Sequence, residues 1–147
     1  MATCAVPGAG QFPNIARIAI TLRESISADH NNWGAMLYDV QSEEAHFAPV
    51  VDGKYAPYQI RDIIDRVGGG DAFGAGLIRI LADRSGDNTS GKRDAVDRHD
   101  AGRDAFAVSF AAAASCLAHS LTGDFNLTSY DEVMALVGGS ATGRVVR

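Results

Sequence analysis

The residues with the clearest chemical potential form one short run, in which Gly68, Gly69 and Gly70 directly precede Asp71 and an apolar helical pattern. Glycines tolerate positive φ angles, and at a helix N-terminus they expose several main-chain N–H groups in one concave turn. The helix dipole adds about half a positive charge there, which suits the turn to an anion such as phosphate. A purely structural alternative is that the glycines form a turn and Asp71 caps the helix. The two interpretations are compatible.

Asp71 adds a reaction to this anion site. The helix N-terminus should keep its carboxylate ionised at neutral pH. A carboxylate beside bound phosphate is repelled by it, so an acid at this position suggests a functional purpose. One such purpose is to accept the proton of a hydroxyl that attacks the phosphoryl group. The glycine N–H groups would stabilise the charge on the transferred group, each by about 3 kcal/mol. The run therefore favours phosphoryl transfer.

The elements that must position this turn follow from the apolar patterning. Strands are expected over residues 16–22, 33–39, 44–50 and 58–65, and helices over residues 72–82 and 104–120. A third helix is expected after Ser129, which forms a capping box with Glu132, and Gly138 suits its C-cap. Residues 1–14 match neither pattern and are expected to form an irregular lead-in. The polar, charged residues 85–103 are expected to form an exposed loop.

Length and composition narrow the class of protein. The 147 residues suggest one domain, and 46% hydrophobic with 21% charged residues is typical of a soluble globular protein. The net charge of -5 argues against a nucleic-acid or anionic-membrane surface, and no apolar run approaches the ~20 residues that span a bilayer. The N-terminus is a poor signal peptide, and Cys4 and Cys116 do not make a disulfide framework. A cytoplasmic protein without nucleic-acid or membrane partners is expected.

Two other motifs are rejected. The run from Gly86 to Arg93 nearly spells a Walker A loop, but Arg93 stands where Ser or Thr must ligate magnesium. Cys116 and His119 share a helix face, yet two ligands are too few for zinc. No direct protein metal site is therefore expected.

The run "DRVGGGDAFGAG" resembles the second signature of the ribokinase (PfkB) family of carbohydrate kinases, in which an aspartate and two residues precede Gly-Ala-Gly-Asp. Gly69 stands in place of the alanine. The segments "ITLRESISADHNNWGAMLYD", "AAASCLAHSLTGDFN" and "GRVVR" look like the 2-dehydro-3-deoxygluconate kinases of this family. The resemblance implies an α/β, ribokinase-like three-layer fold with a mixed sheet and flanking helices. Residues 15–147 would form its C-terminal, nucleotide-binding portion.

The resemblance also implies an activity and its participants. The γ-phosphate of ATP would pass to a hydroxyl of a sugar acid, with 2-dehydro-3-deoxygluconate as the expected substrate. Mg²⁺ would bridge the phosphates, and a monovalent cation would lie near Asp65. Asp71 would be the catalytic base and contact the substrate hydroxyl. The anion hole would consist of Gly68, Gly69 and Gly70.

Further binding residues come from the same resemblance. The candidates for nucleotide binding are Thr21, Arg23, Ser25, Ser115 and Cys116, and the candidate for sugar-acid binding is Asp124. Structural alternatives remain open. Arg23 and Glu24 could form a surface ion pair, Cys116 could be a small core residue, and Asp124 could begin a turn.

Much of the family's usual sequence has no counterpart in this chain. Ribokinase-like kinases are much longer, and their N-terminal half carries a Gly-Gly signature, most sugar-binding residues and a small lid. We therefore infer an internal start, a broken reading frame or a gene fragment. An open strand edge and exposed apolar patches are expected, with self-association or pairing with a separate N-terminal half. The alternative functions are a fructokinase- or ribokinase-type sugar kinase and a non-catalytic nucleotide-binding or interaction fragment.

Overall fold

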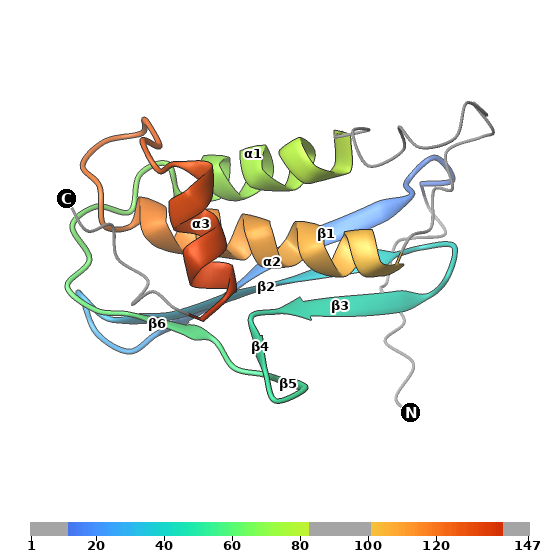
Figure 1. Ribbon diagram of the computed structural model, residues 1–147, viewed down its shortest axis with the longest axis horizontal. Helices are drawn as coiled ribbons and strands as arrows, with labels where there is room; N and C mark the ends of the chain where they lie inside the picture. Colours follow the sequence, from blue (N-terminus) through green and yellow to red (C-terminus); the bar gives the residue numbers. More distant parts are fainter. Residues whose placement is uncertain (1–11, 83–100, 140–147) are drawn as a thin grey trace.

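The computed structural model describes residues 12–82 and 101–139 of the chain (Figure 1). The strands are β1 (Arg17–Ser25), β2 (Asn31–Asp39), β3 (Glu44–Ala48), β4 (Val50–Val51), β5 (Lys54–Tyr55) and β6 (Tyr58–Ile60). The helices are α1 (Gly69–Ala82), α2 (Ala101–Ala118) and α3 (Tyr130–Val137). Strands precede helices, as predicted, and the described fold combines both. None of these helices is long and apolar enough to cross a bilayer.

β2 is the central strand of the sheet. β1 pairs with it in antiparallel register over nine residues, beginning with Arg17 opposite Asp39. β3 and β6 share the other edge of β2, where β3 pairs with residues 35–39 and β6 with residues 31–33. All pairings among the described strands are antiparallel, so the mixed sheet implied by the resemblance is not observed there. The connections from β1 to β2 and from β2 to β3 are short, and a short connection returns the chain as an antiparallel neighbour.

A small hairpin separates β3 from β6. β4 and β5 are joined by Asp52 and Gly53, whose φ angles are 50° and 74°. A type I′ turn needs positive φ at both central residues, and Asp-Gly is one of its preferred pairs. The Ala56 N–H donates to the Pro49 carbonyl oxygen at 3.0 Å and closes the neck of the hairpin. The strand predicted over residues 44–50 therefore ends before Pro49, and the hairpin was not predicted.

α2 lies at the centre of the helical layer. All three helices cover the same face of the sheet (Figure 1), so a second helical layer is not seen in the described part of the chain. Leu37 of β2 and Val108 of α2 are fully buried where the helix meets the sheet. α1 packs against α2 at Gly76, where an added Cβ would lie 3.1 Å from the Ala111 Cα. The small residues at this contact therefore permit the two helices to approach closely.

The predicted caps of α3 are confirmed in part. The Ser129 hydroxyl oxygen accepts the Glu132 N–H at 3.3 Å, and the Glu132 carboxylate accepts the Ser129 N–H at 2.7 Å. Gly138 is the C-cap, and its N–H donates to the Met134 carbonyl oxygen at 2.9 Å. Its φ is -74°, and the left-handed residue is Gly139 with a φ of 74°.

Several predicted boundaries are corrected by the structure. β6 ends at Ile60 instead of residue 65, because Asp62 has a φ of 54° that an extended strand does not allow. α1 begins at Gly69 instead of residue 72, so two of the glycines belong to its first turn. α2 begins at Ala101, so residues 101–103 of the predicted charged loop are helical. Residues 85–100 of that loop and residues 1–11 of the predicted lead-in lie outside the described residues.

A buried ionic contact ties β1 to α2. The Arg17 Nε donates to both carboxylate oxygens of Asp104 at 2.9 Å and 2.8 Å. Asp39 lies on the other side of the guanidinium, with 3.7 Å between Arg17 Nη2 and Asp39 Oδ2. The side chains of Asp104 and Asp39 are only 1% and 2% exposed. Arg17 therefore lies between two buried carboxylates, and the Oδ1 of Asp39 also accepts the N–H groups of Gln41 at 2.8 Å and Ser42 at 3.0 Å.

Candidate functional site

The glycine–aspartate run forms a tight turn at the start of α1. Gly68 has a φ of 79°, which L side chains rarely adopt. A Cβ at this position would also lie 3.1 Å from the main-chain Cα and oxygen of Asp124. Glycine is therefore required at position 68 both by the backbone conformation and by the close approach of the loop after α2.

The helix start leaves main-chain donors available. The Ala72 N–H donates to the Gly68 carbonyl oxygen at 2.8 Å, which closes the first turn of α1. The N–H groups that precede Ala72 have no acceptor within the helix. A Cβ added at Gly70 would meet no atom within 4 Å, so the space beside it is open. Asp71 is exposed in the same turn. Donors and a carboxylate thus share one accessible helix end.

α2 holds the first turn of α1 from the core side. The Ser115 hydroxyl donates to the Gly69 carbonyl oxygen at 2.6 Å. The Nδ1 of His119 lies 2.8 Å from the Ser115 carbonyl oxygen and must carry a proton, because a carbonyl oxygen only accepts. The His119 ring also meets Trp33 edge-on, with 4.7 Å between the ring centroids. Sequence analysis considered His119 only as a metal ligand and missed this supporting role.

His119 is suited to this position as a neutral ring. Burial lowers its pKa, and the positive charges of Arg23 and Arg66 act in the same direction. The hydrogen bond with the Ser115 carbonyl acts in the opposite direction but is the smaller effect. A neutral ring avoids placing a charge in the core beneath the helix start.

Asp65 joins two loops through its carboxylate. Its Oδ1 accepts the N–H groups of Arg66 at 2.7 Å and Val67 at 3.0 Å, and its Oδ2 accepts that of Gly123 at 2.9 Å. These donors lower the pKa of Asp65, and the Gly123 N–H has the largest effect. The carboxylate therefore fastens the turn before α1 to the loop after α2.

The Asp65→Asn variant is expected to be less stable than the wild type at neutral pH and to lose this difference in acid. The lowered folded-state pKa means that the carboxylate contributes stability above its unfolded pKa of about 3.9. That contribution disappears as the pH falls through the folded-state value. Asparagine keeps one acceptor oxygen but turns an NH₂ group toward one of the two loops. Thermal unfolding between about pH 7 and pH 3 should show the two melting curves converging.

The matched control is Asp52→Asn, which changes an exposed aspartate in the β4–β5 turn to a residue that also tolerates positive φ. Its melting temperature should follow that of the wild type at every pH. A constant gap between Asp65→Asn and the wild type down to about pH 3 would contradict the assigned role.

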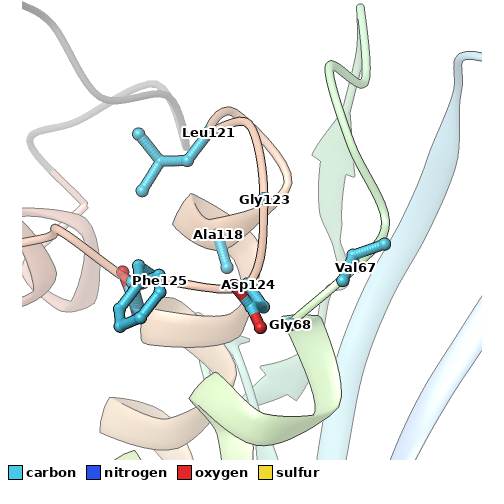
Figure 2. Close-up of a pocket in the computed structure, with 8 residues that line it drawn as sticks. Val67, Gly68, Ala118, Leu121, Gly123, Asp124 and Phe125 are labelled. Atoms are coloured by element: carbon cyan, nitrogen blue, oxygen red, sulfur yellow. The ribbon is translucent and has the colours of Figure 1, made fainter.

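A shallow depression lies between the turn and the loop after α2 (Figure 2). It is lined by Val67, Gly68, Ala118, Leu121, Gly123, Asp124, Phe125 and Asn126. Asp124 is exposed there, and its main chain packs against Gly68. Phe125 is 80% exposed beside it. The predicted sugar-acid contact and the predicted anion hole are thus neighbours.

Solved structures of other proteins share this arrangement of elements. The chain is similar to 2-dehydro-3-deoxygluconokinase from Thermotoga maritima, with 32% identity and a TM-score of 0.63 over 89% of this chain and 32% of that one. It shares its fold with a PfkB family carbohydrate kinase from Listeria grayi, with 24% identity and a TM-score of 0.66 over 94% of this chain and 36% of that one. The chain resembles part of a PfkB-family carbohydrate kinase, as predicted.

The match is partial in length. The chain spans about a third of each of these two kinases. No protein-family model matches the chain, and no curated protein matches it.

The departure from the PfkB signature at Gly69 has a structural reason. A Cβ at this position would lie 3.0 Å from Cε1 of His119, closer than nearly all real contacts of this kind. The ring cannot easily move, because it is 4% exposed and is held by Ser115 and Trp33. Glycine at position 69 therefore makes room for the histidine.

The Gly69→Ala variant is expected to lower the free energy of unfolding by about 1 kcal/mol, because overpacking outweighs the gain in helix propensity. In a His119→Ala background the same change should raise stability, by up to about 1 kcal/mol. Urea denaturation of the four proteins in this cycle measures the coupling. Gly70→Ala is the matched control, since its Cβ would meet open space. Equal effects of the two glycine replacements would refute the contact.

The three nucleotide candidates on β1 share one face of the sheet. Thr21, Arg23 and Ser25 alternate along the strand, and Arg23 lies opposite Trp33, whose ring contacts His119. Arg23 and Ser25 are exposed, with 3.4 Å between Nη2 and Oγ. These side chains therefore lie on the side of the sheet that the helices cover.

Two structural alternatives left open by the sequence, a surface ion pair of Arg23 with Glu24 and a core role for Cys116, can be compared with the contacts in the structure. Glu24 accepts a hydrogen bond from the Asn32 side chain at 2.7 Å, and Arg23 contacts Ser25 instead of Glu24. The Cys116 thiol is fully buried, and burial raises its pKa to about 12. Cys116 therefore has the environment of a small core residue, and the equally buried Ser115 hydroxyl is engaged with α1.

Proposed function

We propose that this chain provides the nucleotide side of an ATP-dependent carbohydrate kinase that phosphorylates a sugar acid, with 2-dehydro-3-deoxygluconate as the substrate. The observation that carries the proposal is the exposed Asp71 directly after three glycines at the N-terminus of α1. The 32% identity with the Thermotoga maritima 2-dehydro-3-deoxygluconokinase supports the choice of substrate. A cytoplasmic location is proposed with it.

In this mechanism the Asp71 carboxylate accepts the proton of the attacking sugar hydroxyl. The hydroxyl oxygen forms a bond to the γ-phosphorus while the bond from phosphorus to the bridging oxygen breaks, which releases ADP. The N–H groups of Gly68, Gly69 and Gly70 donate to the non-bridging oxygens, and each donor stabilises the transition state by about 3 kcal/mol. A weak base suffices, because the loose transition state depends mainly on positioning and charge stabilisation.

The remaining residues would bind and position the reactants. Thr21, Arg23 and Ser25 would contact the nucleotide, and Asp124 would contact the sugar acid. Within the described ranges, no group of three or more acidic, histidine or cysteine side chains is arranged to hold a metal ion. Mg²⁺ is commonly held largely by substrate phosphates and waters, which fits this site.

A monovalent cation near Asp65 would depend on main-chain oxygens, because the carboxylate already accepts three N–H groups. Asp65 therefore acts as a positioning residue in this proposal.

A second candidate is a nucleotide-binding fragment that is catalytic only with further polypeptide. The chain spans about a third of its matched kinases, and this observation favours the candidate. The partial match also leaves a fructokinase- or ribokinase-type substrate as an alternative.

Two measurements on the chain test these functions. Calorimetric titration with ADP and with a non-hydrolysable ATP analogue should show binding, and a coupled ADP-release assay with a panel of sugars and sugar acids should show turnover. Binding with turnover on 2-dehydro-3-deoxygluconate supports the first proposal, and binding without turnover supports the second. The absence of nucleotide binding would contradict both.

A further inference from the structure

Arg66 lies in the turn that leads into α1, two residues before Gly68. Its main-chain N–H is one of the three that the Asp65 carboxylate accepts. The N–H groups of Ile64 and Asp65 both donate to the His119 carbonyl oxygen, at 3.0 Å and 3.4 Å. The backbone that carries Arg66 is therefore fixed beside the end of α2 and next to the predicted anion hole.

The Arg66 guanidinium reaches the loop between β1 and β2. Its Nη2 donates to the Ala28 carbonyl oxygen. Asp29 lies in the same loop, but its carboxylate accepts the Ser27 hydroxyl at 2.6 Å. Among the described residues, no carboxylate is within ion-pair distance of Arg66. A guanidinium has five N–H donors and Arg66 is exposed, so most of these donors are accessible to a ligand.

A second guanidinium acts on the same place. Arg23 of β1 is exposed, contacts the Ser25 hydroxyl at 3.4 Å and, within the described ranges, also has no carboxylate at ion-pair distance. Burial is the main reason for the lowered pKa of His119, and the charges of Arg23 and Arg66 lower it further. The His119 ring lies 3.0 Å from where a Gly69 Cβ would be. Both arginines are therefore within electrostatic reach of the helix start.

The charges at this end of the molecule favour a polyanion. The chain has a net charge of -5, yet two guanidinium groups without carboxylate partners lie near a helix N-terminus that carries about half a positive charge. Their mutual repulsion falls when a multiply charged anion binds between them. Arg66 contacts the loop that follows Arg23 and β1, whereas Asp124 approaches Gly68 from the loop after α2. The nucleotide is thus a better occupant than the sugar acid.

We propose that Arg66 binds the polyphosphate of the nucleotide, together with Arg23. A guanidinium can donate two parallel N–H bonds to one phosphate, so it both orients the group and neutralises part of its charge. The inference rests on the proposed function, because it adds one residue to the same nucleotide site. It makes Arg66 a contact of the substrate in addition to a link between two loops.

Chemical modification of the wild-type chain tests the contact directly. Phenylglyoxal modifies accessible arginines, and peptide mass spectrometry measures the rate at each of them. Inorganic tripolyphosphate at about ten times its Kd should slow the modification of Arg66 and Arg23 about tenfold. Arg61 should react at an unchanged rate, because it is exposed and hydrogen-bonds to Gln59 at 3.0 Å on the surface. Gluconate, which has a single carboxylate, should protect none of the three.

Arg66→Gln measures the contribution of the charge. Glutamine keeps an NH₂ group for the Ala28 carbonyl oxygen, so circular dichroism and thermal melting should match the wild type. Calorimetric titration should show an affinity for tripolyphosphate that is about 10- to 100-fold lower, the range expected for a charge-assisted hydrogen bond. The affinity should also depend less on salt, because one cation has been removed. Arg66→Lys should recover part of both, and the matched control Arg61→Gln should behave as the wild type.

The contrary outcomes are distinct. An Arg66 that stays reactive in the presence of tripolyphosphate would overturn the inference, as would a wild-type chain that does not bind this anion. Equal affinity and equal salt dependence of Arg66→Gln and the wild type would assign Arg66 to the loop contact alone. Turnover separates the inference from the proposed function. Protection of Arg66 without turnover on any sugar would sink the kinase and leave this contact standing, and turnover with an unprotected Arg66 would do the reverse.

Discussion

Asp71→Asn is expected to reduce the rate of phosphoryl transfer by about 10²- to 10⁴-fold, the contribution typical of a general base. The asparagine side chain has nearly the same shape but cannot accept the proton of the attacking hydroxyl. Nucleotide affinity should persist or rise slightly, because a negative charge beside the phosphates is removed. The rate is measured by coupled ADP release with whichever preparation shows turnover, and the affinity by calorimetric titration.

The matched control is Asp131→Asn. Asp131 of α3, like Asp71 of α1, is an exposed acid in the first turn of its helix. Its replacement should leave both rate and affinity unchanged. An Asp71→Asn protein with undiminished turnover would show that another group takes the proton. Loss of nucleotide binding in that variant would point instead to a structural cap.

Arg17→Met is expected to be the most destabilising single change in the described part of the chain. It leaves Asp104 and Asp39 buried without the cation that lies between them. Breaking a buried ionic contact by removing one partner typically costs about 3 to 5 kcal/mol, a large part of the total stability of a domain. Urea denaturation followed by circular dichroism should show a midpoint far below that of the wild type.

Arg61→Met is the matched control for charge and side-chain length. Arg61 is exposed and hydrogen-bonds to Gln59 on the surface at 3.0 Å, so its replacement should change stability by less than about 0.5 kcal/mol. Replacing Asp104 by leucine in the Arg17→Met background should recover part of the loss, since one buried charge is then removed. Similar midpoints for Arg17→Met and Arg61→Met would contradict the role assigned to the buried contact.

Local signals in the sequence were sufficient where a single element decides the structure. The capping box of Ser129 and Glu132 was predicted correctly because its two residues lie in one helical turn. The β4–β5 hairpin was missed although its Asp-Gly turn is a local signal, because the apolar run before it was extended through Pro49. The strand predicted over residues 58–65 was too long. Ile63 and Ile64 continue a β-branched run, but the positive φ of Asp62 interrupts it.

The support of the helix start could not be predicted in the same way. The contact between Gly69 and His119 joins residues far apart in the sequence, and only the packing of α1 on α2 brings them together. The hydrogen bond from the Gly123 N–H to the Asp65 carboxylate also joins residues far apart in the sequence. Sequence patterns indicated the glycines and the acid, whereas the residues that fix their geometry depend on tertiary contacts.

The hairpin between β3 and β6 has a practical consequence. The chain leaves the sheet and returns to it at the neck of the hairpin, which the hydrogen bond from the Ala56 N–H to the Pro49 carbonyl oxygen closes. An added Cβ at Gly53, in the turn of the hairpin, would meet no atom within 4 Å. Additional residues between Asp52 and Gly53 would thus extend into solvent without shifting the register of any strand on β2. This turn is therefore a suitable place to graft an epitope or a spectroscopic label whose signal reports on the intact protein.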